Sequence, residues 1–247
     1  MDHAERLLVL DQFYGQLQFL EKADGGKRIL SQCDGRMDWP RRGVYFFFED
    51  GELREDSVTL RVVRVGTHAL RPSKSTLWGR LSQHKGSVGG SMPGGGNHRG
   101  SIFRLHVGTA LLASGDWPKE AKGNWGTGST AKGRVREDEF AVEVAVSRHI
   151  GSMPFLWLAV DDETGTSSDQ RVIEAGAIAL LSNTDRSAID SSSASRLGQF
   201  ARREAVRTSG LWNVEHVQSS PTSEFLNTLR RHIQTTTSVS SPSPSGS

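Results

Sequence analysis

The stretch Gly43-Val44-Tyr45-Phe46-Phe47-Phe48 decides the fold that we expect for this chain. It is apolar and aromatic, and it is closed by the acidic turn Glu49-Asp50-Gly51. A short apolar run that ends at such a turn is typical of a buried strand. A second run, rich in β-branched residues, occupies 58–65 and ends at Gly66. The two runs together predict a β-hairpin with Tyr45 on its first strand.

A helix is expected soon after the hairpin. Residues 76–84 have a helical pattern, and Ser75 precedes them as a residue able to cap a helix N-terminus. Arg80 and His84 are four residues apart, so their side chains share one face of this helix. An arginine and a histidine on a helix beside a strand tyrosine form an arrangement suited to cleaving a phosphodiester.

A second informative helix is predicted over 166–183. Ser167 and Gln170 have the spacing of a capping box, and an apolar stripe runs along the segment. Glu174 lies at the edge of that stripe, where its carboxylate is partly removed from water. Two interpretations of Glu174 stay open, an ion pair at the boundary of the core and a metal ligand.

The rest of the chain predicts elements that surround the hairpin. Residues 4–21 have apolar positions near a helical period. The segments 140–146 and 155–160 are rich in Val, Phe and Trp, and we expect both to be strands that extend the sheet. Further helices are expected from 101, over 196–207 and over 224–233, with loops at 85–100, 114–135 and 187–195.

Composition limits the classes of protein to be considered. The chain has 247 residues, enough for one domain of ordinary size, and a net charge of +2, which permits nucleic-acid binding without arguing for it. The single Cys33 rules out an internal disulfide or a multi-cysteine zinc site and suits a reducing compartment. The sequence has no apolar run of about 18 residues, so no membrane contact is expected and a cytoplasmic protein is the default.

Several families of enzyme are disfavoured because their motifs are missing. The Gly-rich stretch at 85–100 lacks the strand, lysine and helix of a phosphate-binding loop. The sequence contains no His-Glu-x-x-His motif and no Gly-x-Ser-x-Gly elbow. The polar residues left to test are Tyr45, Arg64, His68, Arg80, His84, His98, Glu174 and Asn213.

The order of these residues resembles the GIY-YIG nuclease superfamily over about 43–216. Gly43-Val44-Tyr45 resembles its first motif, and Arg64-Val65-Gly66 stands where its second motif would fall. The pair Arg80 and His84 resembles the family's Arg-x-x-x-His helix. Glu174 resembles the single metal-binding carboxylate, and Trp212-Asn213-Val214 resembles a late aromatic-Asn element that lines the site. His98, followed by Ser101-Ile102, resembles a further histidine of some homing-type members.

The sequence departs from the family pattern at two places. Arg64 stands where the second motif has a tyrosine, and only Tyr14 and Tyr45 are present in the whole chain. Asn183 is a rival to Asn213 for the role of the late asparagine, because the segment from Glu174 to Asn213 is long. Without a second tyrosine, Tyr45 serves alone or a histidine assists it.

The resemblance implies an endonuclease that depends on Mg²⁺, or Mn²⁺, and acts on DNA. Tyr45 would be the general base, and nearby cations would favour its anionic form, because a free phenol has a pKa of about 10. Arg80 and Arg64 would contact the phosphate, His84 would relay a proton, and Asn213 would position a phosphate or a water. Glu174 would hold the metal, with waters as the other ligands. DNA contacts are expected from Arg71, Lys74, Lys85, His98 and Arg99.

The expected architecture is a small α/β (α+β) fold, a three-stranded mixed or antiparallel sheet flanked by helices. An alternative function is a binding module for nucleic acid or protein with an altered active site, which the departure at Arg64 motivates. The domain boundaries that we predict are an N-terminal helical extension at 1–39, a nuclease-like domain at 40–217 with insertions near 85–100, 114–135 and 184–208, a helix at 218–234 and a disordered tail at 235–247.

Overall fold

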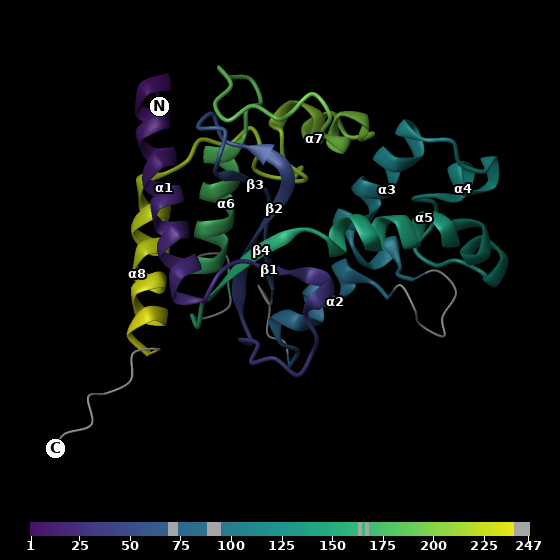
Figure 1. Cartoon of the computed structure of the whole chain (residues 1–247), viewed down its shortest axis with the longest axis horizontal. Helices are drawn as coiled ribbons and strands as arrows, with labels where there is room; N and C mark the ends of the chain where they lie inside the picture. The colour runs from purple at the N-terminus through teal and green to yellow at the C-terminus, as the bar shows by residue number, and fades with distance from the viewer. Residues whose placement is uncertain (69–73, 88–94, 163–164, 166–167, 240–247) are drawn as a thin grey trace.

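The computed structural model describes residues 1–68, 74–87, 95–162, 165 and 168–239. Its centre is a four-stranded sheet in the order β1-β4-β2-β3, in which every neighbouring pair is antiparallel (Figure 1). The predicted hairpin is confirmed as β2 (Gly43–Leu53) and β3 (Leu60–His68), and the strand predicted at 155–160 is β4 (Pro154–Ala159). The fourth strand, β1 (Arg28–Ile29), was not predicted.

Alternation along β2 gives the protein two hydrophobic cores. Val44, Phe46 and Phe48 face one core, whereas Tyr45 and Phe47 face the other. Because successive side chains of a strand point to opposite faces, a strand that is apolar at every position must be covered on both sides. The aromatic run therefore predicts a sheet with helices on both faces, as the structure has it.

Two groups of helices cover the two faces (Figure 1). The first core contains side chains of α1 (His3–Ala23), α6 (Asp169–Leu181) and α8 (Ser223–Val239). The second contains side chains of α2 (Leu77–Lys85), α3 (Ile102–Ser114) and α5 (Gly133–Gly151). The described part of the chain has no helix with the length and apolar character needed to cross a bilayer.

The strand predicted over 140–146 is wrong, because these residues lie in the middle of α5. Their valines favour strands by intrinsic propensity, but Val142, Val146 and Ile150 recur at intervals of four and are all buried. Glu139 and Glu143 are buried on the same helix. Because two of the buried positions are polar, the helical period of the segment is not evident from its apolar residues alone.

The segment 114–135, predicted as an exposed insertion, is partly structured. It contains α4 (Lys119–Asn124), and Ala121 and Trp125 are buried. The Trp125 indole donates a hydrogen bond from Nε1 to the Leu105 carbonyl at 3.2 Å. Trp125 also occupies the space beside Gly108, where a Cβ would lie 1.9 Å from the indole ring. This segment is therefore packed onto α3.

Three further predictions need correction. The helix predicted over 196–207 is divided into a 3-10 turn, η3 (Leu197–Phe200), and α7 (Glu204–Ser209). The tail predicted to be disordered begins with the last turns of α8, which ends at Val239; residues 240–247 lie outside the described residues. The loop predicted over 85–100 ends in a 3-10 turn, η2 (His98–Gly100), and its positions 88–94 are not described. A last 3-10 turn, η1 (Leu30–Gln32), follows β1.

Candidate active site

Two glycines on the hairpin and at its entry make room for the site. In the β2–β3 register Tyr45 lies opposite Gly66, and a Cβ at Gly66 would lie 2.3 Å from the Tyr45 hydroxyl oxygen. A Cβ at Gly43 would lie 2.5 Å from the Leu158 carbonyl on β4. Real Cβ atoms do not approach other atoms so closely. Glycine is therefore required sterically at both positions of the motifs.

A buried chain of hydrogen bonds begins at Tyr45. Its hydroxyl lies 2.8 Å from Nε2 of His84, and Nδ1 of His84 lies 2.7 Å from Oγ of Ser101. Tyr45, His84 and Ser101 are each no more than 1% exposed. The chain takes one residue each from β2, α2 and the N-cap of α3. Tyr45 and His84 are 39 positions apart in sequence, and His84 and Ser101 are 17 apart.

The pKa of the His84 imidazole is held well below its ordinary value. Burial is the main cause, and the positive charges of Arg80, Arg64 and Arg104 add to it. His84 is therefore neutral at physiological pH, with a single proton on one of its two ring nitrogens.

Arg64 is a buried cation between the tyrosine and the predicted metal ligand. It donates from Nη1 to the Trp212 carbonyl at 2.8 Å, and its guanidinium lies 4.6 Å from the centre of the Phe103 ring. Burial lowers the pKa of Arg64, while Tyr45 and Glu174 act to raise it. Its Nε finds no partner among the described residues. The side chain that replaces the expected tyrosine thus places a cation beside Tyr45.

Glu174 projects from α6 next to the end of β3. Its Oε2 accepts a hydrogen bond from the Thr67 hydroxyl at 3.2 Å. Burial raises the pKa of Glu174, and the opposing effects come from Arg64, Thr67 and His216. Glu174 is therefore a partly desolvated carboxylate with a hydroxyl donor. It has the chemistry of a ligand for a cation.

These residues line one cleft of about 460 Å³. Tyr45, Arg64, Arg80, Glu174 and Asn213, all predicted site residues, contribute to its walls. His84 lies behind Tyr45, fully buried, so it acts on the cleft through the tyrosine. The other lining residues are Thr67, His68, Ile102, His106, Arg171, Ile178, Trp212, Val214, Glu215 and His216.

The two candidate asparagines lie in different places, and Asn213 is the one that lines the cleft. The Asn213 amide pairs with the backbone of Val65, donating to its carbonyl at 2.8 Å and accepting from its N–H at 3.1 Å. It thereby fixes the 212–214 segment against β3 at the cleft. Asn183 instead accepts from Arg6 at 2.8 Å and binds the backbone of Ile189, and it is not among the residues that line the cleft.

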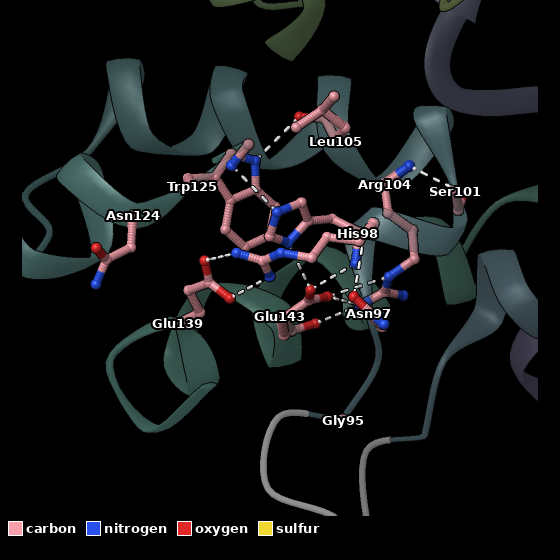
Figure 2. A network of polar contacts seen from close by, with 12 residues as sticks. Gly95, Asn97, His98, Ser101, Arg104, Leu105, Asn124, Trp125, Glu139 and Glu143 are labelled. Atoms are coloured by element: carbon pink, nitrogen blue, oxygen red, sulfur yellow. Dashed lines mark hydrogen bonds and ion pairs between the residues drawn. The ribbon is translucent and has the colours of Figure 1, made fainter. Parts of the chain in front are cut away.

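The structure does not bring His98 and Arg99 to the cleft. His98 is buried, donates from Nδ1 to Glu143 at 2.9 Å and stacks on Trp125 with ring centres 3.9 Å apart (Figure 2). Arg99 forms two hydrogen bonds with Glu139, at 2.7 and 2.8 Å. Because both side chains are engaged inside the protein, we do not propose DNA contacts for them.

The other three predicted DNA contacts have different surroundings. Lys85 donates to the Cys33 carbonyl at 2.6 Å and lies 5.5 Å from the centre of the Trp78 ring. Lys74 is exposed, and Arg71 lies outside the described residues. Lys74 and Arg71 stay predictions.

Thr67, His106 and His216 are three of the cleft residues that sequence reasoning missed. Thr67 follows the second motif directly and faces Glu174, as its hydrogen bond shows. His106 lies on α3 and is buried, and its Nε2 has no partner in the described structure. His216 has a positive φ of 62°, which is uncommon for a residue other than glycine. Thr67 could have been found because it stands one residue after the second motif. No sequence pattern points to His106 or His216.

The donor set suits a single hard cation. Within the described residues there is no cluster of three or more His, Cys, Asp or Glu side chains that would form an all-protein metal site. Mg²⁺ does not need one, because it keeps several waters and binds through one or two carboxylates plus substrate phosphates. Glu174, facing an open cleft, fits that requirement.

One comparison with known proteins gave a match. A family model described as a GIY-YIG domain matches residues 4–239, which includes α1, the sheet and α8. No curated protein and no solved structure matches the chain. The matched region is nearly the whole chain, and it contains the Gly43–Tyr45 and Arg64–Gly66 segments of the hairpin. The chain therefore belongs to the GIY-YIG domain family.

Proposed function

We propose that this protein is a Mg²⁺-dependent endonuclease that hydrolyses DNA phosphodiester bonds. Membership of the family indicates a nuclease type of function. The observation that carries the finer proposal is the convergence of Tyr45, Arg64, Arg80 and Glu174 on one cleft. Phosphodiester hydrolysis needs a base for water, cations for the phosphate and help for the leaving oxygen, and these four side chains are suited to those tasks.

Tyr45 is the general base of the proposed mechanism. Its phenolate takes a proton from the water that attacks phosphorus in line with the leaving 3′ oxygen. Arg64 and Arg80 bind the non-bridging phosphate oxygens and stabilise the charge that develops on them. Arg80 is held for this by hydrogen bonds to Gln83 at 3.1 Å and to the Gly100 carbonyl at 3.2 Å.

Glu174 is the proposed metal ligand, with Thr67 orienting its carboxylate. A bound Mg²⁺ supplies positive charge for the leaving 3′ oxygen. The expected products carry a 5′ phosphate and a 3′ hydroxyl. Asn213 positions the wall of the cleft through its pairing with Val65. We further propose that the protein works in the cytoplasm, where its free Cys33 stays reduced.

Nicking of supercoiled plasmid tests the proposal. The wild-type protein is expected to nick with Mg²⁺ and to stop when EDTA is added. Glu174→Gln is expected to abolish nicking, whereas Glu215→Gln, the same change at another carboxylate of the cleft, retains most of it. Equal nicking by the wild type and Glu174→Gln contradicts the metal assignment. Loss in Glu215→Gln alone assigns the metal to the other carboxylate.

A binding module with an altered active site is the second candidate. The observation that favours it is Arg64, a buried cation tied to the Trp212 carbonyl where the family pattern has a tyrosine. Under this alternative the protein binds DNA at low salt and does not cleave any of several substrates with Mg²⁺ or Mn²⁺. Cleavage of any one of them rejects it.

A further inference from the structure

We propose that Ser101 is a positioning residue that fixes His84 with its proton on Nε2, so that His84 donates a hydrogen bond to Tyr45 instead of accepting the tyrosine's proton. The tautomer follows from the contacts alone. Its consequence for cleavage depends on the proposed nuclease function. A donor His84 differs from the proton relay that the sequence suggested.

The Ser101 hydroxyl has one acceptor for its proton among the described residues. Ser101 is the N-cap of α3, and its Oγ accepts the Arg104 backbone N–H at 3.3 Å. The residue is 1% exposed, so water does not reach it. In the described structure the remaining contact of Oγ is Nδ1 of His84, at 2.7 Å. If Nδ1 carried the proton, Oγ would accept twice and its own proton would be buried without an acceptor, at a cost of about 1–3 kcal/mol.

The direction of this bond sets the state of the other ring nitrogen. Because Nδ1 accepts from Ser101, the single proton of the neutral imidazole lies on Nε2. Nε2 is 2.8 Å from the Tyr45 oxygen, so it is the donor of that bond. The charged side chains around the ring are Arg80, Arg64 and Arg104, and all three oppose a second proton.

A donor at this position has a direct chemical effect. The Nε2–H group stabilises negative charge on the Tyr45 oxygen, and Arg64 adds to this from the side of β3. The phenol's own proton then points away from His84, toward the cleft that Tyr45 lines. His84 thus supports Tyr45 as a base without titrating itself.

The ion-pair network around Glu143 holds Ser101 and His84 in place. Arg104 donates from Nη1 to the His84 carbonyl at 2.9 Å. Its own backbone N–H donates to Oγ of Ser101 (Figure 2). Its guanidinium pairs with the Glu143 carboxylate, which also accepts from the backbone and ring of His98. His98, predicted to touch DNA, therefore belongs to the scaffold that fixes the Tyr45–His84–Ser101 chain.

Three substitutions at Ser101 separate capping from tautomer control. Ser101→Thr keeps both the cap and the hydroxyl donor. Ser101→Asp keeps the cap, since Asp is a good N-cap residue, but it has only acceptors and draws the proton of His84 onto Nδ1. Ser101→Ala removes both functions. Thermal unfolding reports the cap, and the ¹⁵N chemical shifts of the imidazole report the tautomer, with His84→Gln used to assign the His84 signals.

The expected results are specific to each variant. The wild type and Ser101→Thr show the Nε2–H tautomer, and plasmid nicking by Ser101→Thr stays within about threefold of the wild type. Ser101→Asp shows a proton on Nδ1 and nicks at least tenfold more slowly while it unfolds near the wild-type temperature. Ser101→Ala loses both activity and thermal stability.

Two results overturn the proposal: an Nδ1–H tautomer in the wild type, or a folded Ser101→Asp variant that nicks as fast as the wild type. If the wild type has the Nε2–H tautomer but cleaves no DNA, the positioning by Ser101 stands and the nuclease function fails. The wild-type tautomer measurement decides the matter even if a variant does not fold.

Discussion

The two tyrosines of the chain each have a hydroxyl in one buried hydrogen bond, but with different partners. The Tyr14 oxygen accepts the Val62 backbone N–H at 3.0 Å, whereas the Tyr45 oxygen meets His84 and lines the cleft. Removing either hydroxyl keeps an aromatic ring in its core. The pair therefore offers a matched test of a structural and a catalytic hydroxyl.

We expect Tyr45→Phe to lower the rate of plasmid nicking about 10²- to 10⁴-fold, the range of general acid–base contributions. It also leaves the buried Nε2–H of His84 without an acceptor, at a cost of about 1–3 kcal/mol of unfolding free energy. Tyr14→Phe leaves a buried N–H without a partner and is expected to cost about 1–3 kcal/mol of unfolding free energy with the rate preserved. Initial rates and urea unfolding of both variants measure this. A Tyr45→Phe enzyme with unchanged rate removes Tyr45 from the role of base.

Gly66 is expected to be essential to activity because of space. A methyl group there collides with the Tyr45 hydroxyl at 2.3 Å, so Gly66→Ala displaces the ring and its hydrogen bond to His84. We expect a loss of nicking similar to that of Tyr45→Phe. Gly15→Ala on α1, where a Cβ meets nothing within 4 Å, is the control and is expected to add about 0.5–1 kcal/mol of stability. Full activity in a folded Gly66→Ala protein contradicts this argument.

At the scale of single residues, the sequence predicts a site residue when its spacing from its neighbours places it on a particular face of a helix. Arg80 and Glu174 were found in this way, and Tyr45 from its place in an aromatic strand, and all three line the cleft. His106 and His216 were not found, because their role depends on how α3 and a strained turn pack beside β3. No local pattern encodes that packing.

At the scale of elements, α5 illustrates how buried charge conceals a helix. Its inner face contains Glu139 and Glu143 beside valines, and these carboxylates are buried only because Arg99 and Arg104 lie opposite them. The partners come from η2 and α3, more than 30 residues away in sequence. The intrinsic propensities of residues 140–146 therefore favour a strand, but ion pairs with distant residues stabilise a helix there.

Breaking this network is expected to destabilise the protein strongly. Glu143→Gln leaves the fully buried Arg104 guanidinium without its anion, and removing one partner of a buried pair costs about 3–5 kcal/mol. Glu137→Gln, at an exposed position of the same helix, is the control and is expected to change stability by less than about 0.5 kcal/mol. Urea unfolding compares them, and equal stability of the two variants contradicts the network's role.

At the scale of the whole molecule, the aromatic run of β2 predicts the architecture because both of its faces are apolar. That observation requires two helical layers, and the structure has them. The sequence did not predict which helices form each layer. α1 and α8 lie at opposite ends of the chain and pack together, a pairing that neither amphipathic pattern specifies (Figure 1).

Acid is expected to destabilise the fold through its buried neutral histidines. Burial, with Arg64 and Arg203 nearby, lowers the pKa of His106 to about 4, from an ordinary value of about 6.5. Below pH 6.5 the unfolded chain takes up a proton at this position and the folded protein does not, so stability falls as pH falls, until about pH 4. One pKa unit corresponds to about 1.4 kcal/mol, so His106 accounts for about 2 kcal/mol between pH 6.5 and 5.

The comparison with His106→Gln isolates this contribution, because Asp24, whose pKa burial raises to about 6, acts in the opposite direction in both proteins. We expect urea unfolding of the wild type to lose about 2 kcal/mol more than the variant between pH 6.5 and 5. His84, facing Arg80, Arg64 and Arg104, adds the same dependence to both proteins and cancels in the difference. Parallel stability curves for the two proteins mean that His106 takes up its proton in the folded protein as readily as in the unfolded chain. That result contradicts the prediction of a neutral His106 imidazole facing the cleft.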